Sequence, residues 1–115
     1  MNTETITATI QIAKALEDAP AQGLSPYGSI AARLVGTDVL IRTVTMTLTG
    51  HVDDVDNELI ELSSAAWIAD TGRFAEALKS GTLSEVEPFP DSAYVNRGAI
   101  VDIAPWSHPL PRTTK

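Results

Sequence analysis

Cysteine is absent from the 115-residue sequence, which excludes a disulfide framework and thiolate metal sites. Long apolar runs are also lacking, and none approaches the roughly 20 residues that a membrane-spanning helix needs. The first 30 residues lack the basic start and apolar block of a signal peptide. We therefore expect neither secretion nor membrane association. Stability must come from packing and from subunit contacts.

Basic residues are scarce: eight Lys and Arg stand against fifteen Asp and Glu, for a formal net charge of −7. The eight are scattered along the chain, and the mean field of the protein repels phosphate backbones and anionic lipids. Nucleic acid is therefore disfavoured as a partner. The apolar fraction of 43% and charged fraction of 20% are typical of a soluble globular protein. At this length we expect one domain, since domains run from about 50 to 250 residues.

The N-terminal segment, residues 1–28, is interpreted as an arm followed by a linker. Residues 5–12 alternate polar and apolar side chains, many of them β-branched, which favours a half-buried strand. A helical stripe also fits this region, and of the two alternatives helix is preferred; the stripe consists of Ile6, Ile10, Ala13 and Leu16. Residues 19–27 contain Pro20, Gly23 and Pro26 and are typical of a linker.

The central segment reads as a short helix followed by strands. Residues 29–35 are predicted to form the helix, which Gly36 would end. Three strands are predicted next, at 39–43, 46–52 and 58–62. Between the last two, the acidic run at 53–57 predicts a tight turn, because Asp and Asn hydrogen-bond their own backbone.

The C-terminal segment begins with a predicted helix over 71–80, stopped by Gly81. Pro88 and Pro90 argue against a central strand before Tyr94. Strand character resumes over 93–103. Residues 105–115 contain three prolines and are expected to form an extended tail.

Two groups of residues form a recognisable pair of motifs. The first runs from Val39 through Leu48-Thr49-Gly50-His51-Val52 to Asp54, Asn57 and residues 59–62, and the second is Val95 to Ile103 with Arg97-Gly98 inside it. In this order they resemble the two motifs of the Sm-like superfamily of small β-barrels. A glycine suits a strongly bent barrel strand, because the kink leaves no room for a Cβ. The aliphatic residues after Asn57 are shifted by one from the family pattern.

The resemblance implies a mainly β domain: a small barrel of five strongly bent strands over residues 29–104, with a helical insert at about 64–92 between strands 3 and 4. Barrels of this family pair their open edges between subunits, so the expected assembly is a cyclic homo-oligomer. The N-terminal arm and the C-terminal tail are expected to add contacts between subunits.

In RNA-binding relatives, the residues matching Asn57 and Arg97 line a pocket that holds a base, and Gly98 follows the arginine. The resemblance therefore makes Asn57, Arg97 and Gly98 candidate ligand-binding residues. The preferred alternative is that Asn57 is a turn residue and that Arg97 pairs with the acidic hairpin, because the charge of the protein disfavours RNA.

Aromatic residues are few, and four of them are candidate anchors in the core or at a subunit interface, with the core preferred. They are Trp67, Phe74, Phe89 and Trp106. No motif predicts catalysis, a metal site or a cofactor: the acidic residues near His51 lack EF-hand spacing, and no nucleophile lies in a glycine-flanked turn.

The sequences of residues 65–74, 85–90 and 106–112 resemble small uncharacterised proteins of phages and prophages. The functional hypothesis is therefore a non-enzymatic scaffold or assembly protein, located in the cytoplasm or in a virion, whose partners are its own copies and other particle proteins. The alternative is a ring-shaped module that binds RNA or a small nucleotide.

Overall fold

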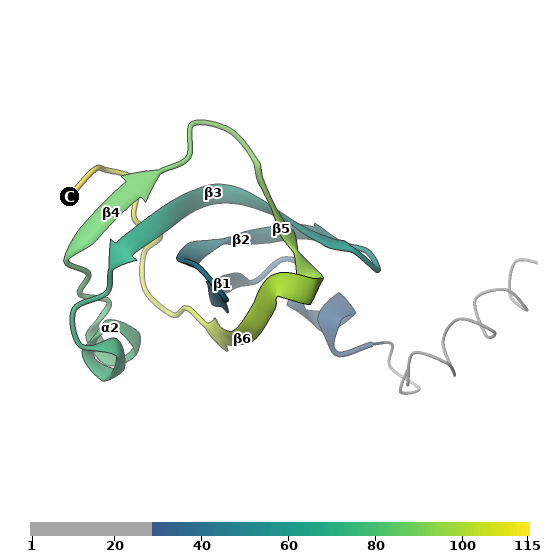
Figure 1. The fold of residues 1–115 in the computed structure, drawn as a ribbon, viewed down its shortest axis with the longest axis horizontal. Helices are drawn as coiled ribbons and strands as arrows, with labels where there is room; N and C mark the ends of the chain where they lie inside the picture. The colour runs from purple at the N-terminus through teal and green to yellow at the C-terminus, as the bar shows by residue number, and fades with distance from the viewer. Residues whose placement is uncertain (1–28) are drawn as a thin grey trace, which may run out of the picture. The chain divides into compact units, whose positions relative to one another are not determined.

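The computed structural model describes residues 29–115, so the predicted arm and linker lie outside the described residues. The chain divides into two units, Met1–Arg33 and Leu34–Lys115, and the second carries the sheet (Figure 1). Its strands are β1 (Asp38–Thr43), β2 (Thr47–Val55), β3 (Leu59–Asp70), β4 (Glu85–Pro88), β5 (Ala93–Asn96) and β6 (Ile100–Pro105). The helical elements are the α-helix α2 (Phe74–Ser80) and the 3₁₀ turns η1 (Ala31–Leu34) and η2 (Arg97–Ala99).

All strand pairs are antiparallel, and the sheet has the order β4-β3-β2-β1-β6. Strand β5 also pairs with β3, so β4 and β5 follow one another along the same edge: β4 lies beside Ala66–Asp70 and β5 beside Leu59–Leu62. After η2 the chain enters β6, which pairs with β1. The expectation of a mainly β domain is confirmed. Within residues 34–115 the sheet forms six strands and is not closed by hydrogen bonds.

The sheet curls strongly (Figure 1), and Gly50 in β2 lies at an irregularity in the pairing of β2 with β3. The register between β2 and β3 shifts between Thr49 and His51, on either side of this glycine. A Cβ at Gly50 would lie 3.1 Å from the Cβ of Leu62. Only glycine therefore permits this close approach without moving β3, which agrees with the role expected of a glycine at a strand bend.

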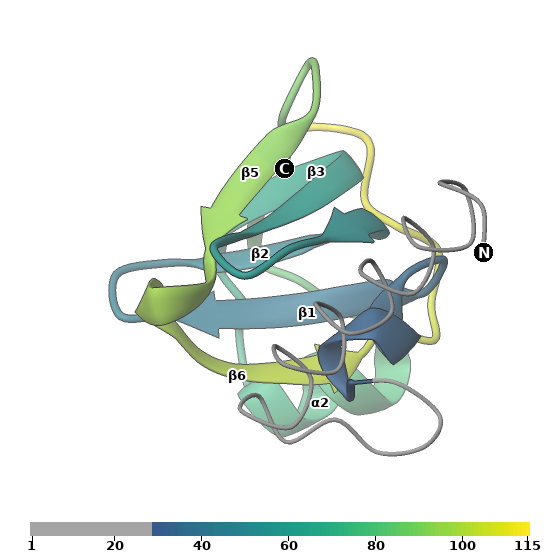
Figure 2. The ribbon, with the colours of Figure 1, turned by 90° about the vertical axis from the view of Figure 1, so that its right-hand side faces the viewer.

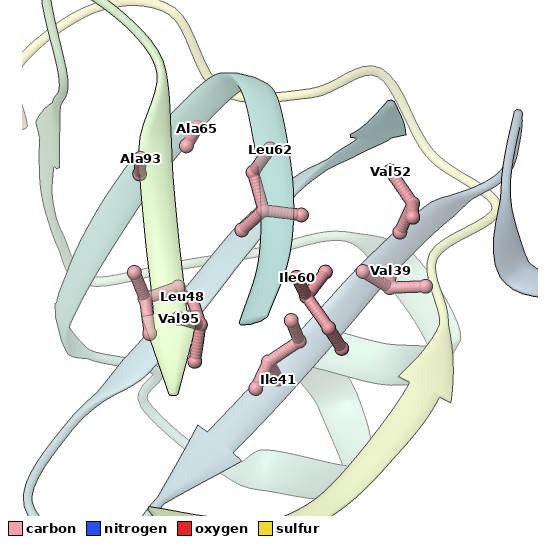
Figure 3. Close-up of a cluster of buried hydrophobic side chains, with 9 residues drawn as sticks. All are labelled: Val39, Ile41, Leu48, Val52, Ile60, Leu62, Ala65, Ala93 and Val95. Atoms are coloured by element: carbon pink, nitrogen blue, oxygen red, sulfur yellow. The ribbon is translucent and has the colours of Figure 1, made fainter. Parts of the chain in front are cut away.

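The curled sheet buries side chains on both faces. On the inner face, β5 packs over β1, β2 and β3, and the buried cluster in Figure 3 consists of Val39, Ile41, Leu48, Val52, Ile60, Leu62, Ala65, Ala93 and Val95. The other face is covered by α2 and the tail, with Leu40, Ala66, Ile68, Ala77, Leu83, Val86 and Trp106 buried. Figure 2 shows β5 and α2 on different sides of β1. A strand covered on both faces reads as a continuous apolar run, which is why Val39-Leu40-Ile41 shows no alternation.

The predicted insert at 64–92 differs most from the structure. Strand β3 continues to Asp70, and β4 lies within the segment, so only α2 and its flanking loops interrupt the sheet. The helix itself is confirmed at Phe74–Ser80, and Gly81 ends it in the left-handed conformation with φ 75°. The prediction that Pro88 does not lie in a central strand is confirmed, because β4 is at the edge of the sheet, where a proline is tolerated.

Smaller differences concern the bounds of three predicted elements. The predicted strand over 93–103 is divided by η2 into β5 and β6. The predicted turn at 53–57 is shorter, because β2 continues to Val55 and carries Asp53 and Asp54. The helix expected over 29–35 is the 3₁₀ turn η1, followed by Gly36 with φ 84°.

Candidate functional site

The edge of the sheet formed by β4 and β5 has two halves with different surroundings. The β4 half is covered by the chain's own tail: Val86 and Lys115 exchange two main-chain hydrogen bonds, of 3.0 and 2.9 Å. The β5 half has no such cover among the described residues. The extended tail predicted for residues 105–115 thus pairs with its own domain here, and its contacts with neighbouring subunits stay a prediction. An uncovered strand edge offers main-chain donors and acceptors to another extended segment.

The direction of the β5 main-chain groups follows from the bonds at its end. The amide of Arg97 donates to the carbonyl of Glu58, and the carbonyl of Leu59 accepts from the amide of Asp56 within the hairpin. Hydrogen-bonded and non-hydrogen-bonded pairs alternate along an antiparallel ladder. Val95 and Ala93 therefore bond to β3, whereas the amides and carbonyls of Tyr94 and Asn96 face the outer edge.

A groove of about 480 Å³ lies beside this outer edge. Its residues come from β5, from the segment before it and from the hairpin that joins β1 and β2, and Thr43, Met46, Leu48, Phe89, Tyr94 and Asn96 are among them. None of the groove residues carries a charge. In a protein with a net charge of −7, such a neutral and mainly apolar strip suits an extended apolar segment better than an ionic ligand.

The three candidate ligand-binding residues lie at one corner of the domain, next to this edge. Arg97 contacts the hairpin on both sides of Asn57: its side chain donates to the carbonyl of Asp56, and its amide donates to that of Glu58 at 2.8 Å. Asn57 is exposed at the hairpin tip. Gly98 donates its amide to the side chain of Asn96 at 2.8 Å and so begins η2. Asn57 and Arg97, 40 residues apart in sequence numbering, thus belong to the same corner.

Carboxylates dominate the electrostatics of this corner. The side chain of Asp56 accepts hydrogen bonds from the amides of Leu59 and Glu58, and these bonds lower the pKa of Asp56, with a smaller contribution from the charge of Arg97. The hydroxyl of Tyr94 donates to Glu61 at 3.0 Å, which raises the pKa of Tyr94. A phosphate would meet several negative charges here, with the Arg97 guanidinium already bonded to the hairpin.

The four aromatic candidates have different environments. Trp106 is buried at 4% exposure in the outer-face core, and its indole N–H donates to the carbonyl of Pro109 at 3.3 Å. Phe89 and Phe74 are partly buried against the inner-face and outer-face clusters, respectively. Trp67 lies on β3 with 39% exposure. Trp106 therefore acts as a core residue, and Trp67 is the most accessible of the four.

Two side-chain pairs elsewhere on the sheet were not expected from the sequence. His51 on β2 bonds Asp38 on β1 at 2.8 Å through Nδ1, and the hydroxyl of Ser63 donates to Asp53 at 2.9 Å. Both pairs are between neighbouring strands, and each residue already has its partner. The sequence could not predict these pairs, because it does not give the register between strands. Asp38 and His51 become opposite neighbours only when β1 and β2 pair.

A third pair ties the helix to the sheet. The guanidinium of Arg42 on β1 bonds both carboxylate oxygens of Asp102 on β6, and it also lies 4.3 Å from the centre of the Phe74 ring. These hydrogen bonds lower the pKa of Asp102 and raise that of Arg42. Arg42 thereby fixes the first turn of α2 to the two strands.

These features define a mainly β protein with one open antiparallel sheet, an uncovered strand edge and a neutral groove beside it. No protein-family model matches the sequence, and no curated protein is significantly similar to it. None of the helices among residues 29–115 is both long and apolar enough to cross a membrane.

Proposed function

We propose that this protein is a non-enzymatic scaffold or assembly protein that forms a cyclic homo-oligomer, and that it is a structural component of a phage or prophage particle. The observation that carries the assembly proposal is the uncovered outer edge of β5, next to the tail-covered edge of β4. Natural proteins cover strand edges, and the most direct cover for the β5 part of this edge is a neighbouring subunit.

The Sm-like barrel belongs to this proposal. The order β4-β3-β2-β1-β6, in which the last strand, β6, pairs with β1, supports this part of the proposal. Repeated head-to-tail contact through one edge closes into a ring when the rotation between subunits allows it. The phage or prophage origin is supported by the sequence pattern alone.

The assembly proposal is tested by the native mass of the full-length protein. We expect light scattering and native mass spectrometry to give one defined multiple of the 12.2 kDa chain over a range of concentrations. A compact monomer at all concentrations would overturn the proposal. Glu76→Arg on the exposed surface of α2, away from β5, should leave the mass unchanged and serves as the control for nonspecific charge effects.

A ring-shaped module that binds RNA or a small nucleotide is the second candidate, and the observation in its favour is that Arg97 bonds the hairpin on both sides of Asn57. The surrounding carboxylates oppose it. Binding of labelled oligonucleotides and mononucleotides at low salt decides the question, with Arg97→Ala compared with Arg73→Ala, which changes the charge equally at a distant hollow. Absence of binding by the wild type rejects this candidate, and equal losses in both variants reject the corner as the site.

A further inference from the structure

We propose that residues 5–12 of one copy bind in the groove beside β5 of a second copy and add a strand to its outer edge. This inference rests on the proposed self-assembly and names the two surfaces that meet. It starts from the edge itself: the main-chain groups of Tyr94 and Asn96 face outward, beside a groove of about 480 Å³.

The polarity of the groove indicates which segment of the chain binds in it. The groove is lined entirely by uncharged residues, although the protein carries fifteen acidic and eight basic side chains. Residues 5–13 form an uncharged stretch between Glu4 and Lys14 and contain neither proline nor glycine, so each residue can supply a main-chain donor and acceptor. A charged segment entering the same groove would lose hydration without gaining a partner.

Side-chain alternation fits the same geometry. When bound to the edge, residues 5–12 would adopt the strand that their alternation allows, and not the helix preferred from the sequence alone, because only an extended segment can pair with the outward main-chain groups of β5. In an extended segment Ile6, Ala8, Ile10 and Ile12 share one face, which would cover the apolar residues Leu48 and Phe89 of the groove. Thr5, Thr7 and Thr9 would face water. Strand addition of this kind draws affinity from main-chain hydrogen bonds and specificity from alternate side chains.

The length of the intervening chain permits the contact between copies. Residues 13–28 separate the segment from the described part, and sixteen residues extend to roughly 50 Å at most. This reach exceeds the diameter of a small domain, so a neighbouring copy is accessible. A groove on one copy that receives a segment from the next is a heterologous contact when it is not returned, and such contacts close into a ring when the rotation between subunits allows it.

Cross-linking tests the contact directly, because the natural chain has no cysteine. Thr7→Cys and Thr45→Cys proteins, each with one cysteine, are mixed and treated with a short bismaleimide; Thr45 is an exposed residue of the groove. We expect a cross-linked heterodimer at least about fivefold more abundant than with Glu76→Cys on α2, the control partner. Equal yields with both partners would overturn the proposal, as would a Thr7→Cys/Thr45→Cys double variant that cross-links only within one chain.

A second measurement separates strand addition from a general apolar contact. Ile10→Asp should abolish the cross-link, whereas Thr9→Asp, on the other face of an extended segment, should retain it. Full-length Ile10→Asp protein then serves as a receptor with a free groove for a labelled peptide of residues 3–14. Adding Tyr94→Pro, which removes one outward amide, should weaken peptide binding about fivefold relative to Tyr94→Ala, the effect of one lost main-chain hydrogen bond.

The native mass of the same samples distinguishes the two proposals. An oligomeric wild type that gives no specific cross-link overturns the groove contact and leaves self-assembly standing. A monomeric wild type overturns both. Equal sensitivity of the cross-link to Ile10→Asp and Thr9→Asp would contradict an extended segment with one apolar face.

Discussion

Lys115 and Val86 exchange main-chain hydrogen bonds in both directions, so the last residue of the chain pairs with the edge strand β4. The tail reaches this position along a fixed path. His108 bonds the carbonyl of Leu78 at 2.7 Å, and Arg112 donates to the carbonyl of Ala65 at 3.0 Å. The tail therefore acts as a strap that protects half of one edge of the sheet.

Replacement of Arg112 by alanine should loosen this strap. We expect a loss of about 1–2 kcal/mol in the free energy of unfolding, because the side-chain hydrogen bonds to the carbonyls of Ala65 and Phe89 are both removed. Hydrogen exchange should show a larger local effect, with reduced protection of the Val86 amide, which bonds Lys115. Thr113→Ala is the matched control in the same segment. Unchanged protection of Val86 in Arg112→Ala would contradict the role of Arg112 in holding the strap.

Gly81→Ala should destabilise the protein more than Gly36→Ala. Both glycines have positive φ, of 75° and 84°, where an L side chain is strained by about 1–3 kcal/mol. At Gly81 a Cβ would also lie 2.7 Å from Cγ of His108, whereas at Gly36 nothing lies within 4 Å. Urea denaturation of both variants measures the difference.

The collision can be separated from the strain with a further pair of variants. His108→Ala removes the ring that a Cβ at position 81 would meet, so Gly81→Ala should be less harmful in that background. If the two substitutions are simply additive, the steric part of the explanation is incorrect.

Thr49→Val should stabilise the protein. Thr49 is fully buried, and its hydroxyl has no hydrogen-bond partner among the described residues. An unsatisfied buried polar group costs about 1–3 kcal/mol, and valine has nearly the same shape without the hydroxyl. Thermal and urea unfolding should both show the gain. Thr47→Val, on the same strand but partly exposed, is the control, and a Thr49→Val protein that is no more stable than that control would show that the hydroxyl is satisfied in solution.

Asp102→Asn should reduce stability at neutral pH and lose its effect in acid. The hydrogen bonds from Arg42 lower the pKa of Asp102 below its unfolded value of 3.8. The stabilisation is therefore fully present above that value and is lost as the pH falls through the lower folded pKa. Melting temperatures measured from about pH 2 to 7 should converge for the wild type and Asp102→Asn at the acid end. The exposed Asp91→Asn is the control, and a gap between the wild type and Asp102→Asn that stays constant down to the lowest pH would contradict this coupling.

The sequence supports the fold to different degrees along the chain. Local signals located β1, the start of β2 and α2, because β-branched runs and a glycine stop act over a few residues. The full length of β3 was not visible, since Ala65 and Ala66 have little strand preference and become buried only through the helix, the tail and the curled sheet. Strand β4 was missed for a similar reason, because the edge position that tolerates Pro88 is a tertiary property.

The candidate site was likewise predicted in part from the sequence and in part depends on tertiary structure. The resemblance to Sm-like motifs placed Asn57 and Arg97 together, and the structure puts both at one corner. The groove beside β5 could not be predicted, because its walls come from the β1–β2 hairpin and from β5 with the segment before it, which are far apart in the sequence. The uncharged character of residues 5–13 was present in the sequence, but it gains meaning only beside a groove of the same polarity.

The pairing of β1 with β6 also has a consequence for biosynthesis. Arg42 and Asp102 are 60 residues apart, so one side of β1 stays unpaired until β6 has left the ribosome. Contacts between distant residues slow folding, because the chain must close a long loop before they form. The nascent domain therefore completes its sheet only after β6 has emerged, and chaperones that shield exposed strand edges should associate with it before that point.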